Sequence, residues 1–385
     1  MSIIKNSEKI LLTNKEAAEF LGVSRPTFVK LRSELNLDSI AILIGKRLRF
    51  PRDELEKILK GESRLNAQKF QDPQDFPIKK IVKKLCIFSD HNIVDLDLDK
   101  DEIDLTDIEV VDPFGTLSLL TMLINKSKLG KKIFLKIDQS ITCRHLKKIY
   151  FFDMLQMYAP NIVWDKEILK GDDSIDSENI LPITVIRHKG SERSTLEKLI
   201  SILGVHGFTS ETSGYIGGIL GELADNCMTH SHEFLSERIC FLQAQRHSFK
   251  NNSHCLVVAI ADVGQGVAES LRKNPKHQSL TDEQAILSSF KHKISSWPDE
   301  ALRGKGLTDT LGLTMGNKGL LRIASGNKDF SLNFVESSNG KTFKKCTPPL
   351  IDTNGTRIGI FYIDHKFQKI TREEVSKYIN KLLEQ

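Results

Sequence analysis

The chain has no apolar run that approaches the roughly 20 residues a membrane-spanning helix needs. Residues 1–12 contain neither a long apolar segment nor a small-residue cleavage site. The six cysteines are scattered, with no C-x-x-C pair and no grouping with histidines at zinc spacing. These absences argue against membrane anchoring, secretion, a disulfide framework and a structural zinc site. We therefore expect a soluble cytoplasmic protein with reduced thiols.

Length and charge limit the remaining classes. A chain of 385 residues predicts two or three domains that each bury a core. The net charge of +5 is only mildly basic, so local basic patches are expected and a nucleic-acid coat over the whole chain is not.

Two polar stretches without helix or strand periodicity, Gly61–Lys80 and Gly171–Pro182, predict linkers. The expected organisation is multidomain. It comprises an N-terminal domain over 1–62, a linker over 63–80, a middle domain over 81–170, a linker over 171–182 and a C-terminal domain over 183–385.

The N-terminal segment has helix-start signals followed by a basic hairpin. Thr13 and Glu16 form a capping box, and Pro26 follows the cap Ser24 in the first turn of a second helix. With Ile44-Gly-Lys-Arg-Leu-Arg-Phe50, these features resemble the excisionase/MerR-type winged helix-turn-helix. The resemblance implies duplex DNA as a partner, bound through a recognition helix and a wing; the alternative is a small protein-interaction module. The implied DNA-binding residues are Arg25, Thr27, Lys30, Arg32, Lys46, Arg47 and Arg49.

The middle segment alternates strand and helix patterns. We expect a strand over 104–111, a helix over 115–126, a strand over 132–137 and a helix over 145–157, hence a small parallel or mixed sheet. The order of strand, Val111-Asp-Pro-Phe-Gly115, helix and strand is similar to STAS domains. This α/β likeness implies a docking domain for a protein partner, and an unrelated α/β linker domain is the alternative.

The C-terminal segment carries three groups of residues suited to a phosphate-bearing ligand. Glu222, Asn226 and His230 are four residues apart, so they share one helix face. Asp262-Val-Gly264-Gln-Gly266 ends an apolar strand, where the glycines let the backbone approach a ligand closely. Arg303-Gly-Lys-Gly-Leu307 precedes a helix, whose N–H groups and the two cations favour an anion.

Together and in this order, the three groups resemble the nucleotide-binding boxes of the gyrase, Hsp90, histidine-kinase and MutL (GHKL) ATPase superfamily, a Bergerat-type α+β sandwich. The resemblance begins near Ser191 and includes Gly355-Thr356 as the closing element. It implies the cofactors ATP and Mg²⁺, Glu222 as the catalytic residue, Asn226 as the Mg²⁺ ligand, and Leu271–Arg303 as a lid. The implied ATP-binding residues are Asn226, His230, Asp262, Gly264, Gly266, Gly304, Lys305, Gly306, Leu307 and Thr356.

Some details depart from that pattern. Asn226-Cys-Met-Thr-His230 most resembles the form found in anti-sigma serine kinases. Leu307 is followed by Thr308-Asp-Thr310, where the superfamily's glycine box continues Gly-Leu, and this leaves catalytic competence open. Gly340-Lys-Thr342 lacks the first glycine of a P-loop. His230-Ser-His-Glu233 is a weak metal-binding alternative beside the nucleotide site.

The sequence thus favours a bacterial Mg-ATP-binding regulator, with hydrolysis expected, that attaches to DNA and forms homodimers. One alternative is a serine/threonine protein kinase of the anti-sigma type that acts on a protein partner. Another is a nucleotide sensor without hydrolysis. The absence of a membrane segment and of a phospho-acceptor box before Asn226 disfavours a sensor histidine kinase.

Overall fold

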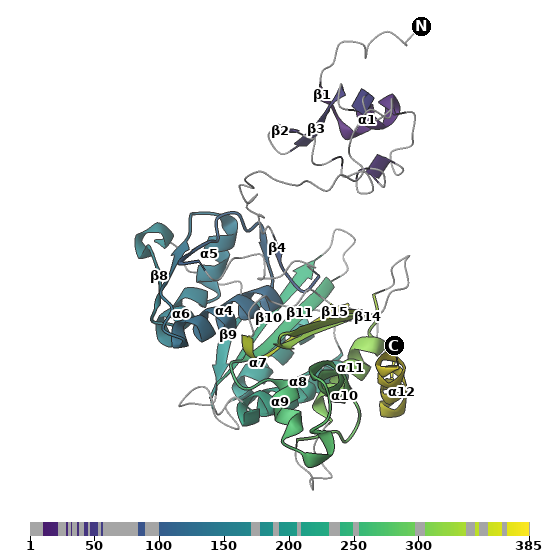
Figure 1. Cartoon of the computed structure of the whole chain (residues 1–385). Helices are drawn as coiled ribbons and strands as arrows, with labels where there is room; N and C mark the ends of the chain where they lie inside the picture. The colour runs from purple at the N-terminus through teal and green to yellow at the C-terminus, as the bar shows by residue number, and fades with distance from the viewer. Residues whose placement is uncertain are drawn as a thin grey trace. The chain divides into compact units, whose positions relative to one another are not determined.

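The computed structural model describes the chain in two compact units, Met1–Lys79 and Lys80–Gln385, which we treat separately (Figure 1). The described residues are 11–21, 28–29, 32, 37, 42–44, 47–52, 55–56, 84–88, 100–170, 178–187, 192–205, 209–230, 239–248, 254–296, 305–335, 343–345, 353–363 and 368–384. The predicted linker over 63–80 and most of the one over 171–182 lie outside these residues.

The N-terminal unit combines a capped helix with a three-stranded sheet. The sheet has the order β1 (Leu11–Leu12), β3 (Arg47–Pro51), β2 (Ile42–Ile44), and α1 (Asn14–Phe20) follows β1. The predicted capping box is present: the amide of Glu16 donates to Thr13 Oγ1 at 3.2 Å, and the amide of Thr13 donates to Glu16 Oε2 at 2.9 Å. Phe28 and Phe50 meet edge to face in the small core. The two predicted strands are confirmed as β2 and β3, which pair antiparallel. The predicted turn between them at 45–46 and most of the predicted second helix, after the cap Ser24, lie outside the described residues.

The body of the protein is built on a seven-stranded antiparallel sheet (Figure 1). Its order is β14 (Phe343–Lys345), β13 (Lys328–Asn333), β12 (Leu320–Gly326), β15 (Thr353–Ile363), β11 (His254–Asp262), β10 (Cys240–Ser248), β9 (Ile180–Ile186). Side chains alternate along β11: Leu256, Val258 and Ile260 join one core, and Cys255, Val257 and Ala259 join another. β11 is therefore buried on both faces, which explains why it is a continuous apolar run.

Helices from the C-terminal part cover one face of this sheet. They include α7 (Glu192–Val205), α8 (Ser210–His230), α11 (Gly306–Gly316) and α12 (Arg372–Leu383). The short helices α9 (Val267–Arg272) and α10 (Asp282–Ser288) follow β11, with a 3-10 turn, η4 (Pro275–His277), between them. The predicted helix over 210–230 and the predicted strand over 254–262 are both confirmed.

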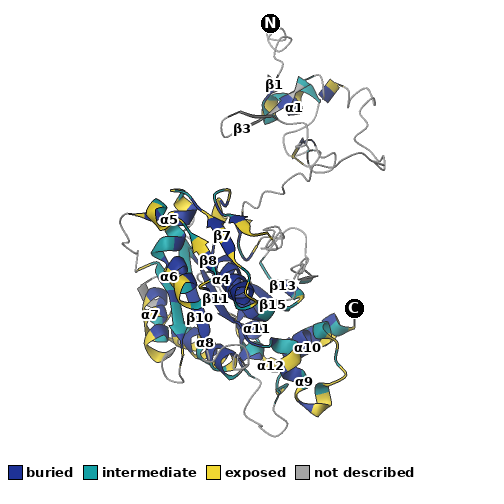
Figure 2. Cartoon of the chain, turned by 60° about the vertical axis from the view of Figure 1, so that its left-hand side comes forward, coloured by how far each residue is buried: buried dark blue, intermediate teal, exposed yellow. Residues whose placement is uncertain are grey.

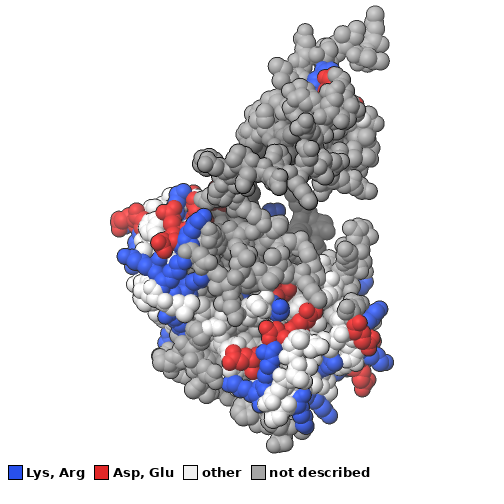
Figure 3. Space-filling view, viewed as in Figure 1, with Lys and Arg blue, Asp and Glu red and all other residues white. Residues whose placement is uncertain are grey.

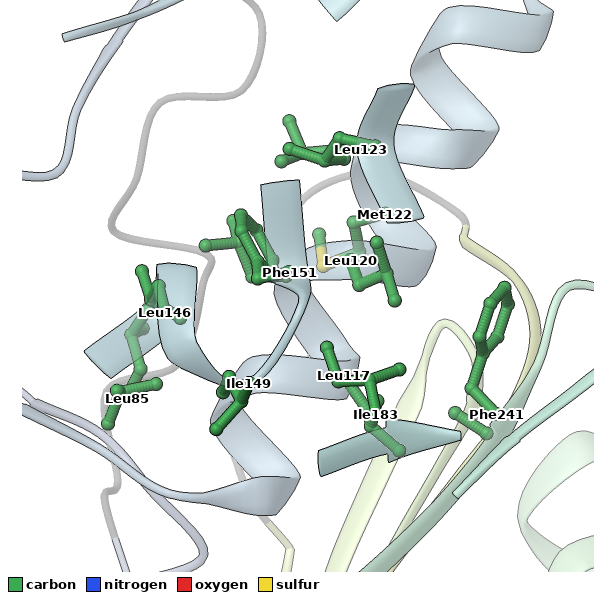
Figure 4. Close-up of a cluster of buried hydrophobic side chains, with 14 of the residues drawn as sticks. Leu85, Leu117, Leu120, Met122, Leu123, Leu146, Ile149, Phe151, Ile183 and Phe241 are labelled. Atoms are coloured by element: carbon green, nitrogen blue, oxygen red, sulfur yellow. The ribbon is translucent and has the colours of Figure 1, made fainter. Parts of the chain in front are cut away.

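The opposite face of the sheet is covered by the middle segment. Its helix α4 (Pro113–Lys128) packs on β10, β11 and β15, and nearly every residue of α4 is buried (Figure 2). In Figure 4, Leu117 and Leu120 of α4 lie near Ile183 of β9 and Phe241 of β10. A helix that is buried on all sides lies between two layers of protein. The blocks predicted as 81–170 and 183–385 thus share one core within a single unit.

The middle segment has parallel strands, as the alternating pattern predicts. β4 (Lys84–Leu85) pairs with β6 (Val110–Val111), and β7 (Ile133–Lys136) pairs with both β5 (Glu102–Asp104) and β8 (Ile162–Trp164). Two details of the sequence-based prediction are wrong. The single strand expected over 104–111 is two short strands in different sheets.

The second wrong detail concerns the helix expected over 145–157. It is two helices, α5 (Ile141–Lys148) and α6 (Phe151–Tyr158), because Tyr150 adopts a left-handed conformation with φ of 66°. That conformation cannot continue a right-handed helix. A 3-10 turn, η3 (Lys166–Leu169), follows β8.

A buried ion pair joins the middle segment to the sheet. Arg322 on β12 is 1% exposed and makes two hydrogen bonds of 2.9 Å with Asp329 on β13. The same guanidinium donates to the carbonyl of Ile87 at 3.2 Å and lies over the ring of Phe114. The Arg322 guanidinium therefore joins the sheet to the middle segment through an ion pair, hydrogen bonds and a contact with an aromatic ring.

Candidate functional site

The described residues form a pocket between α8, the ends of β11 and β15, α9 and the start of α11. Its lining includes residues from all the groups singled out in the sequence: Asn226, Asp262, Gly266, Gly306, Leu307 and Thr356. Segments up to 130 residues apart are thus brought to one cavity, and the three predicted groups form one site in space.

Asp262, at the end of β11, is the buried anionic group of the pocket. It is 3% exposed, and its Oδ1 accepts hydrogen bonds from the amides of Gly264 at 2.7 Å and Thr356 at 3.3 Å. Burial raises the pKa of Asp262 to about 6, although these two amides, the Cys227 thiol and Arg357 all favour the carboxylate. One carboxyl oxygen is therefore fixed by the fold, and the group titrates close to neutral pH.

Two glycines have backbones that a side chain would not tolerate. Gly266 has φ of 85°, and a Cβ there would lie 2.7 Å from Ser325 Oγ. Gly355 has φ of 99°, and a Cβ there would lie 2.1 Å from the carbonyl oxygen of Asp262. Both positions require glycine, because L-residues avoid this region and the space is filled. They keep the chain close around Asp262 and leave the pocket open beside it.

The start of α11 lies against the polar face of α8. A Cβ on Gly306 would be 3.2 Å from Glu222 Oε2 and 3.4 Å from Asn226 Nδ2. Glycine therefore lets the helix N-terminus approach these two side chains. Partial burial and the nearby Asp309 raise the pKa of Glu222, opposed by Arg372 and Lys305.

An ion pair that the sequence does not predict lies beside this contact. Arg372, the first residue of α12, donates from Nε to Asp309 Oδ1 at 2.6 Å and from Nη2 to Asp309 Oδ2 at 2.5 Å. The two residues are 63 positions apart, and no motif joins them. Arg372 also acts on the pKa of Glu222, so the C-terminal helix belongs to the electrostatic environment of the pocket.

The other predicted residues divide into described and undescribed ones. Gly264 holds Asp262 through its amide and is not part of the lining, and Lys305 directly precedes α11. His230 ends α8, but its side chain lies outside the described residues, as does all of Gly304. The sequence analysis did not select several apolar, thiol and hydroxyl side chains that line the pocket. Each of them lies within a few residues of a selected one, and only that closeness in sequence could have pointed to them. They include Leu223, Cys227, Val267, Ser270 and Ile358.

The N-terminal unit provides a second candidate site. Arg47 and Arg49 lie on β3, with their side chains outside the described residues, and Arg25, Thr27, Lys30 and Lys46 lie wholly outside them. Arg32 is described: its guanidinium donates to Asn14 Oδ1 at 3.2 Å and lies 5.4 Å from the centre of the Phe50 ring.

Comparison with known families decides the nature of this unit. Residues 11–63 match a family model described as a helix-turn-helix domain. The N-terminal unit contains a helix-turn-helix domain. The helix-turn-helix domain indicates DNA binding, in agreement with the sequence. No curated protein and no solved structure gives a significant match.

Within the described residues, no helix has the length and apolarity to span a membrane. The same part of the chain contains no group of three or more His, Cys, Asp or Glu side chains arranged to hold a metal ion.

Proposed function

We propose that this chain is a DNA-binding regulator whose body binds Mg²⁺-ATP in the pocket around Asp262. The observation that carries the proposal is the convergence of Asn226, Asp262, Gly266, Gly306 and Thr356 on one cavity. The sequence places these residues in three separate groups along the chain. Unrelated turns and helix faces would not be expected to converge on one cavity.

The buried end of the pocket suits an adenine base. Asp262 Oδ1 is held by two backbone amides, and the carboxylate borders the cavity between apolar residues such as Leu223 and Ile358. A carboxylate accepts hydrogen bonds and does not donate them, so it favours the exocyclic amino group of adenine over the carbonyl of guanine. In this proposal Asp262 selects ATP over GTP.

The other end suits phosphates. Gly306 opens α11 and Lys305 precedes it, so unpaired helix N–H groups and a cation meet at this point. Asn226 is the side-chain ligand for Mg²⁺, with phosphate oxygens and waters as its other ligands. Bound Mg²⁺ supplies charge neutralisation of the phosphates. Glu222 lies beside Gly306, where it orients or deprotonates the attacking group.

The cavity is small for a whole nucleotide. Its volume of about 110 Å³ is below the roughly 300–1,000 Å³ of typical ligand pockets. Residues after α10, including Ile294 and Ser295, form part of the lining. These residues belong to the expected lid, so in this proposal the segment moves outward to admit a whole nucleotide.

One experiment tests the proposal and separates its alternatives. Purified full-length protein is incubated with ATP labelled on the γ-phosphate, with and without duplex DNA. Released phosphate indicates an ATPase, and protein-bound phosphate indicates the anti-sigma type of kinase. Binding without either product indicates a nucleotide sensor.

Site variants test the assignment of residues. Asn226→Ala and Asp262→Ala should each weaken ATP binding measured by calorimetry. Asn380→Ala, an exposed change on α12 away from the pocket lining, is the matched control. Parental affinity in both site variants would show that ATP, if bound, is held elsewhere.

A further inference from the structure

Two hollows lie in the middle segment, away from the pocket around Asp262. One, of about 570 Å³, is formed by α5 and the end of η3, and the other, of about 320 Å³, is formed by α6, β8 and η3. Both include Lys147, Leu169 and Lys170 in their lining, so the two hollows adjoin one another. We call the two hollows together the α5–η3 groove.

The lining of this groove is strongly basic. Its cations are Arg144, Lys147, Lys148, Lys166 and Lys170, and Asp153 is the only carboxylate among the lining residues. Figure 3 shows Lys and Arg gathered at the left of the body, where Figure 1 draws α5 and α6. Glu167, outside the lining, pairs with Lys170 and offsets one charge. Burial, His247 and Lys148 all lower the pKa of His145.

Helix stability does not account for this cluster. Lys147 and Lys148 lie at the C-terminal end of α5, where a cation interacts favourably with the helix dipole, and this effect accounts for two of the five cations. Arg144 is in the middle of α5, and Lys166 and Lys170 come from a different element across the groove. Five cations from two sides therefore line one concave surface, and bringing like charges together costs free energy unless an anion offsets it.

Aromatic surface accompanies the charge. The ammonium of Lys166 lies 5.6 Å from the centre of the Trp164 ring and 3.1 Å from Gln156 Oε1. Trp164 lines the groove beside Phe152. Long, mostly exposed cations with polar and aromatic neighbours suit an extended polyanion better than one small anion, which a few buried donors would grip.

We propose that the α5–η3 groove binds the phosphate backbone of duplex DNA, as a contact separate from the helix-turn-helix domain. The chain already has a domain whose family indicates DNA binding, and tethering raises the effective concentration of that DNA at the groove. Backbone contact through flexible cations gives affinity without sequence preference. The groove thus strengthens attachment to DNA and leaves sequence reading to the helix-turn-helix domain.

The test uses the full chain and a labelled duplex in fluorescence anisotropy, between about 50 and 250 mM salt. The groove variant is Arg144→Gln/Lys148→Gln/Lys170→Gln, which removes three charges from side chains at the surface. The control is Lys198→Gln/Lys377→Gln/Lys381→Gln, which removes three charges from exposed positions on α7 and α12. Circular dichroism checks that both variants fold.

Each lost phosphate contact should reduce the slope of log K against log salt by about 0.9. We expect the groove variant to lose about 2–3 in slope and at least tenfold in affinity at low salt, and the control to match the parent. Arg47→Gln/Arg49→Gln should reduce the slope by an additive amount, because it acts in the other unit. Equal slopes for the groove variant and the control would overturn the proposal, as would a parental protein that does not bind duplex DNA.

Discussion

The proposed role of Asp262 makes adenosine affinity depend on pH. Burial raises the pKa of this carboxyl to about 6. The amides of Gly264 and Thr356 hold Oδ1, so the adenine amino group must donate to Oδ2, and a proton on Oδ2 would turn that acceptor into a donor. With that pKa, about nine-tenths of the groups are ionised at pH 7 and about one-tenth at pH 5. Apparent affinity scales with the competent fraction, so adenosine should bind about tenfold more weakly at pH 5 than at pH 7.

The direction of the pH dependence follows from the protonation state of Asp262 that the ligand binds. A ligand that binds the carboxylate loses affinity as pH falls through 6, and gains nothing further above about pH 7. Adenosine is the appropriate probe, because the phosphates of ATP themselves titrate near pH 6 and would add a second dependence. The measurement is equilibrium dialysis with labelled adenosine between pH 5 and pH 8, with circular dichroism to confirm folding at each pH.

Two variants identify the titrating group. Asp262→Asn presents an amide N–H to the adenine amino group and loses a charged hydrogen bond worth about 1.5–3 kcal/mol, so affinity should fall about 10- to 150-fold and become independent of pH. Glu222→Gln removes a carboxyl with a raised pKa that lies beside Gly306, outside the pocket lining, and should leave the pH profile unchanged. A parental affinity that is equal at pH 5 and pH 7, or an Asp262→Asn variant that keeps the pH dependence, would refute the assignment.

Three further outcomes are expected. Glu222→Ala should retain ATP affinity and lose turnover, because it removes an interaction that acts in the transition state; kcat and Kd measured separately check this. Residues 1–79 alone should bind duplex DNA with a slope of log K against log salt of about −3 to −5, which Arg47→Ala/Arg49→Ala should reduce; a salt titration of binding decides it. Asp329→Ala should lower the free energy of unfolding by about 3–5 kcal/mol, because it removes the carboxylate that offsets the buried charge of Arg322, and Arg322→Met/Asp329→Leu should recover part of that loss in urea denaturation.

The sequence predicts the elements that have strong local signals. The helix over 210–230 has polar residues at helical spacing, and the strand over 254–262 is a short continuous apolar run; both are confirmed. The grouping of Asn226, Asp262 and Gly306 could also be anticipated, because the order of the three groups along the chain resembles that of one family's nucleotide-binding boxes.

Features that depend on distant partners could not be predicted. The pattern of α4 suggests one apolar face, through Leu117, Leu120 and Ile124, yet a second layer of protein buries the helix all round. The break between α5 and α6 falls at Tyr150, a residue with no turn preference. The Arg372–Asp309 pair joins helices 63 residues apart, and no local rule links their side chains.

The middle segment and the pocket meet at one backbone turn. Asn125 of α4 donates from Nδ2 to the carbonyl of Asn354 at 2.9 Å, and two residues later the amide of Thr356 donates to Asp262 Oδ1 at 3.3 Å. Gly355 lies between these two anchors, and its positive φ and tight contact with Asp262 leave the turn little freedom. We therefore expect a ligand that moves the Asp262 carboxylate to strain this turn or to shift α4 through Asn125, because close-packed interiors transmit small displacements.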